Sequence, residues 1–167
     1  MTKTPSGHEI IQDSVEALKH TFRNHASGVA VITMLDAEGK PVGLTATSMT
    51  SLGANPPLAS FNISSGSSTW PAISNGIWVA IHTLGESNQD LAIKMASDHT
   101  KRFANDDWEF GPKGLPIFKG VTAVAIGSIR EIHAVENNAV VILDIVEGLL
   151  GVEQRPLLYF QRNYLIG

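Results

Sequence analysis

Two segments of this chain are unusually rich in small hydroxyl side chains, and their chemistry is the most informative feature of the sequence. The first, Gly43 to Ser51, has five Ser or Thr residues among nine positions. On a strand, Thr45 and Thr47 point to one face, and Ala46 and Ser48 point to the other. Short polar side chains let a ligand approach the backbone, so this segment can line a flat heteroaromatic ring with donors and acceptors along one edge. The alternative is a solvent-exposed strand face, because Thr favours strands.

The second segment runs from Ser64 to Thr69 and precedes Trp70. As a loop that leads into a helical turn, it can present hydroxyls and backbone N–H groups to a phosphate. The alternative is a turn in which Ser68 or Thr69 caps the helix without a ligand. Spacing alone leaves both interpretations open.

Several common chemistries are excluded or disfavoured. The chain has no cysteine, which removes disulfides, thiolate nucleophiles, iron–sulfur clusters and cysteine-bound zinc, so redox chemistry requires a cofactor. The six histidines lack a ligand-like spacing, and we predict no metal site. No Gly-rich nucleotide motif or P-loop is present. No serine lies in a nucleophile-elbow pattern, which disfavours a Ser–His–Asp hydrolase.

The charge distribution constrains the ligand and the location. The net charge is −4 and the Lys and Arg residues are scattered, so no nucleic-acid-binding surface is indicated. A phosphate group must be held by hydroxyls, backbone N–H groups or a single nearby cation. No stretch approaches the roughly 20 apolar residues of a membrane span, and residues 1–8 do not resemble a signal peptide. We therefore expect a cytoplasmic protein with no membrane association.

The elements that position these segments are mostly strands. Asp13 and Glu16 predict a capping box and a helix that continues to about Asn24. Ser87 and Asp90 predict a second capping box at the start of another helix. The predicted strands are 28–35, 42–49, 57–63, 77–84, 121–134, 138–150 and 156–160, the second helix is 87–96, a helical turn covers 70–75, and 99–119 is irregular.

Strands joined as hairpins favour an antiparallel barrel over a doubly wound sheet. We therefore predict a mainly β (α+β) fold, an antiparallel β-barrel with a few peripheral helices. At 167 residues the chain fits a single domain, 1–167, in which residues 1–12 form a flexible or arm-like N-terminus.

Taken in order, short motifs along the chain resemble the flavin reductase-like family of FMN-binding split barrels. The resemblance extends from about Val15 onward, and the matching motifs lie at 22–33, 41–51, 55–58, 67–71, 102–104, 108, 114–116, 156–160 and 164. It implies an antiparallel split β-barrel and an oxidoreductase that reduces FMN or FAD with NADH or NADPH. It also implies a homodimer that often serves a partner monooxygenase.

The resemblance also implies roles for individual residues. Those expected to contact the flavin are Thr45, Ala46, Thr47 and Ser48 along the isoalloxazine, Ser51, Ser64, Ser68 and Thr69 at the ribityl chain or phosphate, and Phe103 beside the cofactor. His82 and Asn138 are candidates for the nicotinamide site. Asn138 stands where the family commonly has the histidine of a Gly-Asp-His turn, and His82 stands where many members have asparagine.

Hydride transfer from nicotinamide to flavin needs no protein acid or base, so no catalytic side chain is expected. The protein must hold two rings about 3 to 3.5 Å apart. Asn138 points to an alternative, a flavin-binding protein that is not a reductase, such as a carrier, an electron-transfer protein or a sensor. A third possibility, a split barrel related to pyridoxamine-phosphate oxidases or haem-handling proteins, lacks the basic phosphate-binding residues of those proteins.

Overall fold

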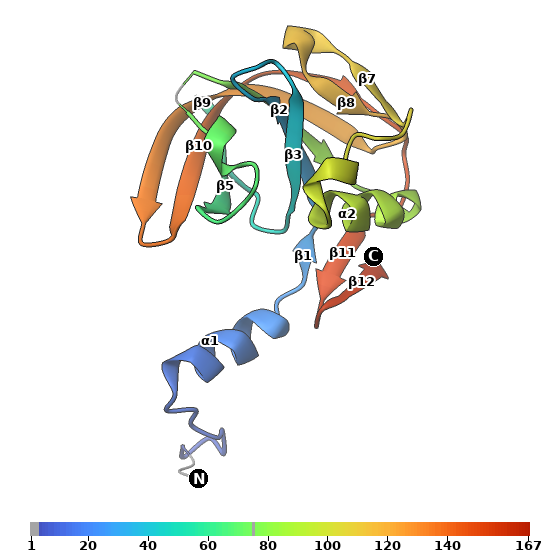
Figure 1. The fold of residues 1–167 in the computed structure, drawn as a ribbon. Coiled ribbons are helices and arrows are strands. Elements are labelled where there is room, and N and C mark those ends of the chain that lie inside the picture. The colour runs from blue at the N-terminus through green and yellow to red at the C-terminus, as the bar shows by residue number, and fades with distance from the viewer. Residues whose placement is uncertain (1–3, 75) are drawn as a thin grey trace.

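Antiparallel strands make up most of the computed structural model, which describes residues 4–74 and 76–167 (Figure 1). The largest sheet has seven strands in the order β3-β2-β6-β9-β10-β5-β4. Its strands are β2 (Ala30–Leu35), β3 (Pro41–Ala46), β4 (Thr50–Ala54), β5 (Pro57–Ser64), β6 (Trp78–Thr83), β9 (Ala123–Val135) and β10 (Asn138–Leu150). The two smaller sheets are β1-β11-β12, made of Ser27–Gly28, Leu157–Phe160 and Asn163–Ile166, and β7-β8, made of Trp108–Phe110 and Pro116–Phe118.

The mainly β architecture with few helices is confirmed, but the seven-stranded sheet does not close into a barrel. Strands β3 and β4 are its two edges and do not pair with each other. Strand β3 ends at Ala46, three residues earlier than predicted, and the chain then crosses to the opposite edge of the sheet. Ser48 lies in this crossing and contacts β5, where its hydroxyl accepts a hydrogen bond from the Asn62 N–H at 3.0 Å.

The core lies on both faces of the sheet. In β2, every residue from Ala30 to Met34 is buried, so neither face of this strand is exposed to solvent. Val31 packs into one cluster with Met95 and Phe118, whereas Ile32 packs into a second cluster. Because β2 is fixed from both sides, its neighbour β3 is held in a defined position at the edge.

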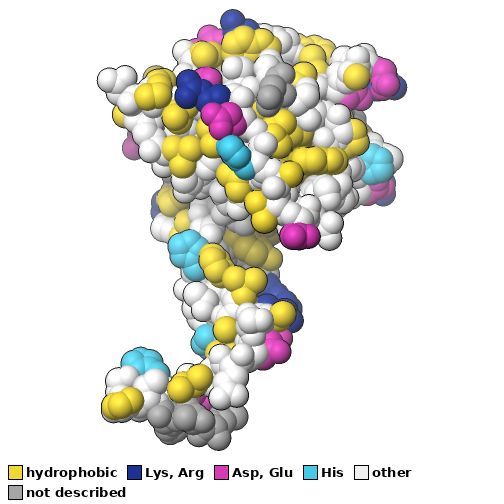
Figure 2. Space-filling view, turned by 90° about the vertical axis from the view of Figure 1, so that its left-hand side faces the viewer, with side chains coloured by type: hydrophobic (Ala, Val, Ile, Leu, Met, Phe, Trp, Pro, Cys, Tyr) yellow, Lys and Arg dark blue, Asp and Glu magenta, His cyan; other side chains and the backbone are white. Residues whose placement is uncertain are grey.

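Helix α1 (Ser14–Arg23) stands away from the sheets (Figure 1). The Asp13 side chain accepts a hydrogen bond from the Glu16 N–H, which confirms the predicted start of the helix. None of its residues is buried, and Figure 2 shows apolar side chains exposed along it. The large exposed apolar residues of this helix are Val15, Leu18 and Phe22. Residues 5–12 before it are also exposed, whereas residues 1–3 of the predicted arm lie outside the described residues.

Helix α2 (Gln89–Ala96) packs Ala92 and Met95 into the core. The predicted Ser87 and Asp90 capping box is wrong, because a 3₁₀ turn (Glu86–Asn88) precedes the helix. The N-cap of α2 is Asn88, so Ser87 lies one residue too early, and its N–H and hydroxyl both donate to the Gln154 side chain.

The remaining helical pieces are 3₁₀ turns at Trp70–Ala72, His99–Lys101 and Pro112–Gly114. The predicted irregular segment 99–119 therefore contains two turns and the β7-β8 hairpin. Within the described ranges, no helix combines the length and apolar character needed to cross a bilayer.

Candidate functional site

The edge of β3 that pairs with no other strand of the sheet offers backbone hydrogen-bonding groups to a ligand. The Gly43 carbonyl points away from β2, because it accepts hydrogen bonds from the Thr69 hydroxyl at 2.9 Å and from Arg102 at 2.7 Å. Backbone groups of an antiparallel strand alternate in direction, so the N–H and carbonyl of Thr45 also face this open edge. An added Cβ at Gly43 would lie 2.5 Å from the Ile32 carbonyl oxygen, so only glycine fits here.

A cavity of about 400 Å³ lies at the end of this edge, within the usual range for small-molecule sites. The predicted residues that line it are Thr45, Ala46, Thr47, Ser48 and Ser64. Asn62, Met95 and Arg102 are among its other lining residues, and Arg102 is the one charged residue of the lining. The structure therefore brings five of the predicted ring-side and phosphate-side residues to one place.

A smaller cavity of about 160 Å³ adjoins the first and shares Arg102 with it. It is lined by three more of the predicted flavin contacts, Ser68, Thr69 and Phe103. Thr69 is buried, and its hydroxyl bond to Gly43 holds the loop against β3. Ser68 and Arg102, which bond each other, can receive an anion here, and Lys40 and Asp36 also line this cavity.

Arg102 is a partly buried cation whose bonds to other described residues all go to neutral oxygens. Its guanidinium donates to the Gly43 carbonyl at 2.7 Å, the Ser68 hydroxyl at 3.0 Å and the Ser97 carbonyl at 2.9 Å. Its Nε is buried and has no partner among the described residues. Burial lowers the pKa of Arg102, and Asp98 partly offsets this effect. A cation held in this way can bind a phosphate.

Arg102 is absent from the predicted contacts, although two signals pointed to it. It lies in the motif at 102–104, and the acidic chain needs a local cation to hold a phosphate. Its orientation depends on the Gly43 carbonyl and Ser68, which are distant in the sequence.

Ser51 does not join this site. It lies on β4, at the opposite edge of the sheet from β3, and lines a mostly apolar cavity of about 340 Å³. The resemblance assigned Ser51 to the flavin by its position in the sequence, whereas β3 ends at Ala46 and Ser51 belongs to the next strand. Ser51 therefore contacts a different part of the molecule.

His82 also lies away from the site, which corrects its prediction as a nicotinamide contact. Its side chain is fully buried in β6, where Nδ1 bonds the Val31 carbonyl at 3.0 Å and Nε2 accepts from the Phe118 N–H at 3.1 Å. Burial lowers the pKa of His82 from 6.5 to about 4. A neutral imidazole with both nitrogens bonded inside the core cannot contact a substrate.

Asn138, the other nicotinamide candidate, lies near the first cavity. It begins β10 and pairs in register with Ser64, which lines that cavity. The adjacent Asn137 carbonyl accepts hydrogen bonds from Ser65 N–H and from the Ser64 hydroxyl. The β9-β10 hairpin is therefore fixed beside the hydroxyl-rich loop.

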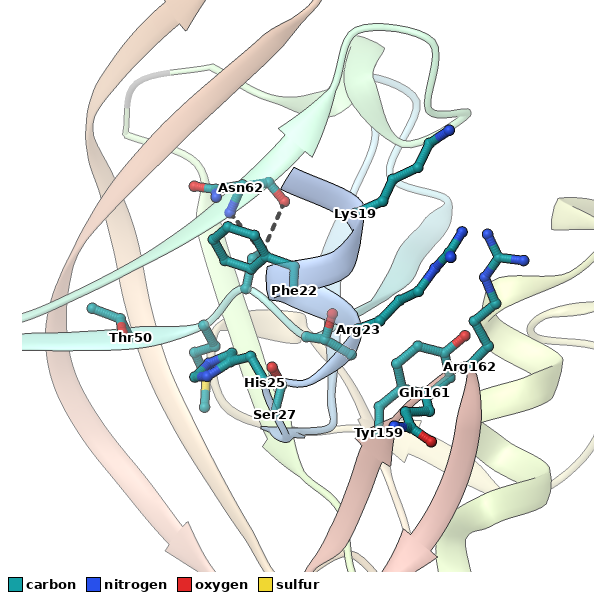
Figure 3. Close-up of a pocket in the computed structure, with 13 residues that line it drawn as sticks. Lys19, Phe22, Arg23, His25, Ser27, Thr50, Asn62, Tyr159, Gln161 and Arg162 are labelled. Atoms are coloured by element: carbon teal, nitrogen blue, oxygen red, sulfur yellow. Dashed lines mark hydrogen bonds between the residues drawn. The ribbon is translucent and has the colours of Figure 1, made fainter. Parts of the chain in front are cut away.

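A third cavity, of about 610 Å³, opens between α1, the segment after β3 and the β11-β12 hairpin (Figure 3). It shares Thr47, Ser48 and Asn62 with the 400 Å³ cavity, so the two are neighbours. The 160 Å³ cavity shares Arg102 with the 400 Å³ cavity and shares no lining residue with this third cavity.

These features fit a flavin. The β3 edge supplies donors and acceptors for the ring. The Nε–H of Arg102, which is buried and has no partner among the described residues, is available to the phosphate. Phe103 stacks on Phe118 with ring centroids 5.5 Å apart, so its position beside the phosphate cavity is fixed by packing. Among the described residues no group of His, Asp and Glu side chains could hold a metal ion.

Comparison with known proteins agrees with this fit. A family model described as "Flavin reductase like domain" matches residues 22–166. The chain is 35% identical over 134 residues to an NADH:FMN oxidoreductase of Rhodococcus qingshengii, covering 70% of this chain and 69% of that protein. It is 32% identical to the reductase subunit of a flavin-dependent monooxygenase of Rhodococcus jostii, covering 83% of this chain and 70% of that protein.

Some relatives are longer than this chain. The chain spans 40% of the length of a Rhizobium meliloti protein described as "Probable flavin reductase", to which it is 35% identical over 126 residues and 75% of its own length. The crystal structure of a flavin reductase domain protein from an Arthrobacter species matches with a TM-score of 0.87 and 44% identity, covering 92% of this chain and 95% of that one.

Proposed function

Because the chain belongs to the flavin reductase-like domain family, we propose that it is an NAD(P)H:flavin oxidoreductase that supplies reduced FMN or FAD to a partner monooxygenase. Its relatives include an NADH:FMN oxidoreductase and a reductase subunit of a flavin-dependent monooxygenase. The observation that carries the proposal is the open β3 edge with the phosphate-binding geometry of Arg102 beside it.

In this proposal the isoalloxazine lies along Thr45 to Ser48 in the 400 Å³ cavity. Backbone groups of Thr45 bond its polar edge, and Ser68 and Arg102 hold the phosphate in the 160 Å³ cavity. Ser64 and Phe103 lie at the sides of the cofactor. Ser51 has no part in this arrangement, because it lines a separate cavity.

When bound, a flavin supplies the hydride acceptor, and the protein's residues perform positioning. The rigid β2-β3 hairpin fixes the plane of the ring, and the hairpin that carries Asn138 lies beside the same cavity. Hydride transfer needs the nicotinamide ring about 3 to 3.5 Å from the flavin, with no proton moved by a side chain. The proposed reductase therefore has no catalytic residue.

We also propose a cytoplasmic homodimer in which residues 1–167 act as one flavin-binding split barrel. The exposed apolar side chains Val15 and Leu18 on α1, which do not line the 610 Å³ cavity, support an association with a second copy, because such surfaces usually mark interaction sites.

Steady-state assays with NADH and NADPH, each with FMN and FAD, test the proposed activity. We expect oxidation of at least one nicotinamide nucleotide well above the free-flavin background. The Arg102→Gln variant should raise KM for flavin, whereas Arg155→Gln, which removes a charge at a surface ion pair with Glu86, should not. No oxidation above background for all four combinations would refute the reductase.

A flavin carrier or sensor is the second candidate, favoured by Asn138, which gives the β9-β10 hairpin an amide in place of an imidazole. It predicts a yellow purified protein whose bound flavin is not bleached by NADH or NADPH without oxygen. Rapid bleaching would exclude this alternative.

A further inference from the structure

The 610 Å³ cavity carries a group of cations that the proposed flavin site does not use. Lys19 and Arg23 come from α1, and Arg162 comes from the turn between β11 and β12. Figure 3 shows these three side chains extending toward the same side of the cavity. No Asp or Glu is among the residues that line it.

Two of these cations have no partner of opposite charge in the described structure. Within residues 4–74 and 76–167, neither the Arg23 nor the Arg162 guanidinium forms an ion pair. Lys19 pairs with Glu16 at 2.9 Å, but both side chains are about half exposed, so solvent screens this pair.

Most of the other Lys and Arg side chains between residues 24 and 161 form ion pairs with Asp or Glu, and the protein as a whole is acidic. These pairs are Lys40–Glu38, Lys94–Asp107, Lys119–Glu109, Arg130–Asp144 and Arg155–Glu86. The wall of this cavity is therefore a local positive region on a chain of net charge −4.

The turn between β11 and β12 holds Arg162 beside the end of α1. Gln161 and Arg162 both have positive φ angles, 48° and 65°, which closes the hairpin tightly. The Gln161 N–H donates to the Arg23 carbonyl at 3.2 Å, and its side-chain amide donates to Asn24 at 3.1 Å. These bonds bring cations from the two ends of the chain to one cavity.

Two aromatic side chains line the same cavity. Phe22 is exposed on α1, and Tyr159 lies partly buried on β11 against Tyr164. Cations beside exposed aromatic rings suit a ligand that combines phosphates with a flat base.

The position of the 610 Å³ cavity relative to the proposed flavin site favours a nicotinamide dinucleotide over the adenylate of FAD as its ligand. The proposed flavin phosphate lies at Arg102, on one side of the 400 Å³ cavity, so the adenylate of FAD would leave the site there. The cationic cavity shares Thr47, Ser48 and Asn62 with the 400 Å³ cavity, and Arg102 does not line it. A nicotinamide dinucleotide whose nicotinamide stacks on the ring would extend past Asn62 into it.

We propose that Lys19, Arg23 and Arg162 bind the pyrophosphate and adenosine part of NADH or NADPH, with Phe22 and Tyr159 as surfaces for the adenine. The proposal rests on the proposed reductase function and names the binding site of its reductant. It gives helix α1 a role in binding substrate.

Isothermal titration with ADP-ribose tests the site without requiring turnover. ADP-ribose has the pyrophosphate and adenosine of the reductant but no nicotinamide ring. We expect the double variant R23Q/R162Q to bind it about 10-fold or more weakly than the wild type, since it loses two charge-assisted contacts. The matched control Arg155→Gln should bind as the wild type does, because its charge lies in the Glu86 pair away from the cavity.

Kinetics provide the second measurement. In R23Q/R162Q the KM for NADH or NADPH should rise by about 10-fold, with kcat and the KM for FMN changed less than about 2-fold. Unchanged affinity for ADP-ribose and unchanged KM for the reductant would overturn the proposal. A rise confined to the KM for FAD, with that for FMN unchanged, would also overturn it, by assigning the cavity to the FAD adenylate.

The two proposals fail separately. A wild-type protein that binds ADP-ribose through Arg23 and Arg162 but shows no flavin reduction would refute the reductase and keep the site. Flavin reduction that the double variant leaves intact in every parameter would keep the reductase and refute the site. Thermal unfolding of R23Q/R162Q is the control for folding. The variant should unfold as the wild type does, because both residues are exposed.

Discussion

His82 makes the stability of the fold depend on pH in a way that can be worked out from its contacts. Its Nδ1 bonds the Val31 carbonyl, and its Nε2 accepts from the Phe118 N–H. A proton on Nε2 would place two donors against each other in the core. Burial accordingly lowers the pKa of His82 from 6.5 to about 4.

The direction of the effect follows from the two protonation states. Between pH 6.5 and about 4 the unfolded chain binds a proton at His82 and the folded chain does not. Stability is therefore fully present above pH 6.5 and is lost as pH falls toward 4. Each pKa unit is worth about 1.4 kcal/mol, so the free energy of unfolding should fall by about 3 kcal/mol across this range.

The variant His82→Asn isolates this contribution. It is less stable than the wild type at pH 7, because it cannot bond both Val31 and Phe118. The difference in free energy of unfolding between the wild type and His82→Asn should shrink by about 3 kcal/mol between pH 7 and pH 4, since only the wild type has a titrating side chain at position 82.

Urea unfolding followed by tryptophan fluorescence at several pH values measures this difference. The control His133→Asn removes an exposed histidine that pairs with Glu131, and it should change the pH dependence by less than about 1 kcal/mol. If wild type and His82→Asn lose stability in parallel from pH 7 to pH 4, the reasoning about the buried imidazole is wrong.

Three further substitutions test the site and its support. Arg102→Gln should weaken FMN binding by about 10-fold or more, measured by quenching of flavin fluorescence, because a charge-assisted contact is lost; unchanged affinity would contradict the assignment of the phosphate. Gly43→Ala should lower the free energy of unfolding by about 1–3 kcal/mol, since its Cβ meets the Ile32 carbonyl; an equally stable variant would show that β3 can shift. Asn88→Ala should cost about 1–3 kcal/mol in urea unfolding, because it leaves the Gly85 N–H unpaired and removes one of the two hydrogen bonds to the Gly120 carbonyl, the other coming from Gln154; no loss would mean that solvent satisfies the Gly85 N–H.

The sequence predicts best those elements whose signals are local. The turn at Asp36 is an example, because its side chain accepts from the N–H groups of Glu38 and Lys40 and fixes the hairpin between β2 and β3. Strand β10 was predicted with its observed bounds, Asn138–Leu150, since its apolar pattern is long.

Elements defined by distant partners were missed. Strand β4 is exposed at every residue and has no apolar alternation, and it is a strand because it pairs with β5. The same dependence on distant partners explains which residues of the candidate site were predicted and which were missed. Thr45 to Ser48 share a cavity because they follow one another, whereas Arg102 reaches it by bonding a carbonyl 59 residues earlier. Whether His82 faces the core or a ligand depends on how β6 packs against other strands, and the residues around His82 in the sequence do not determine this packing.

The small β1-β11-β12 sheet has a consequence for how the protein is made. It pairs Ser27 and Gly28 with Tyr159 and Leu158, so two segments that lie far apart in the sequence are held together. Such contacts close the longest loops in the chain and form late. All strands of the seven-stranded sheet lie before residue 151, because its last strand in the sequence, β10, ends at Leu150. The cationic cavity, in contrast, needs both Arg23 and Arg162. On the ribosome, the proposed flavin site can therefore assemble before the cavity that we assign to the reductant.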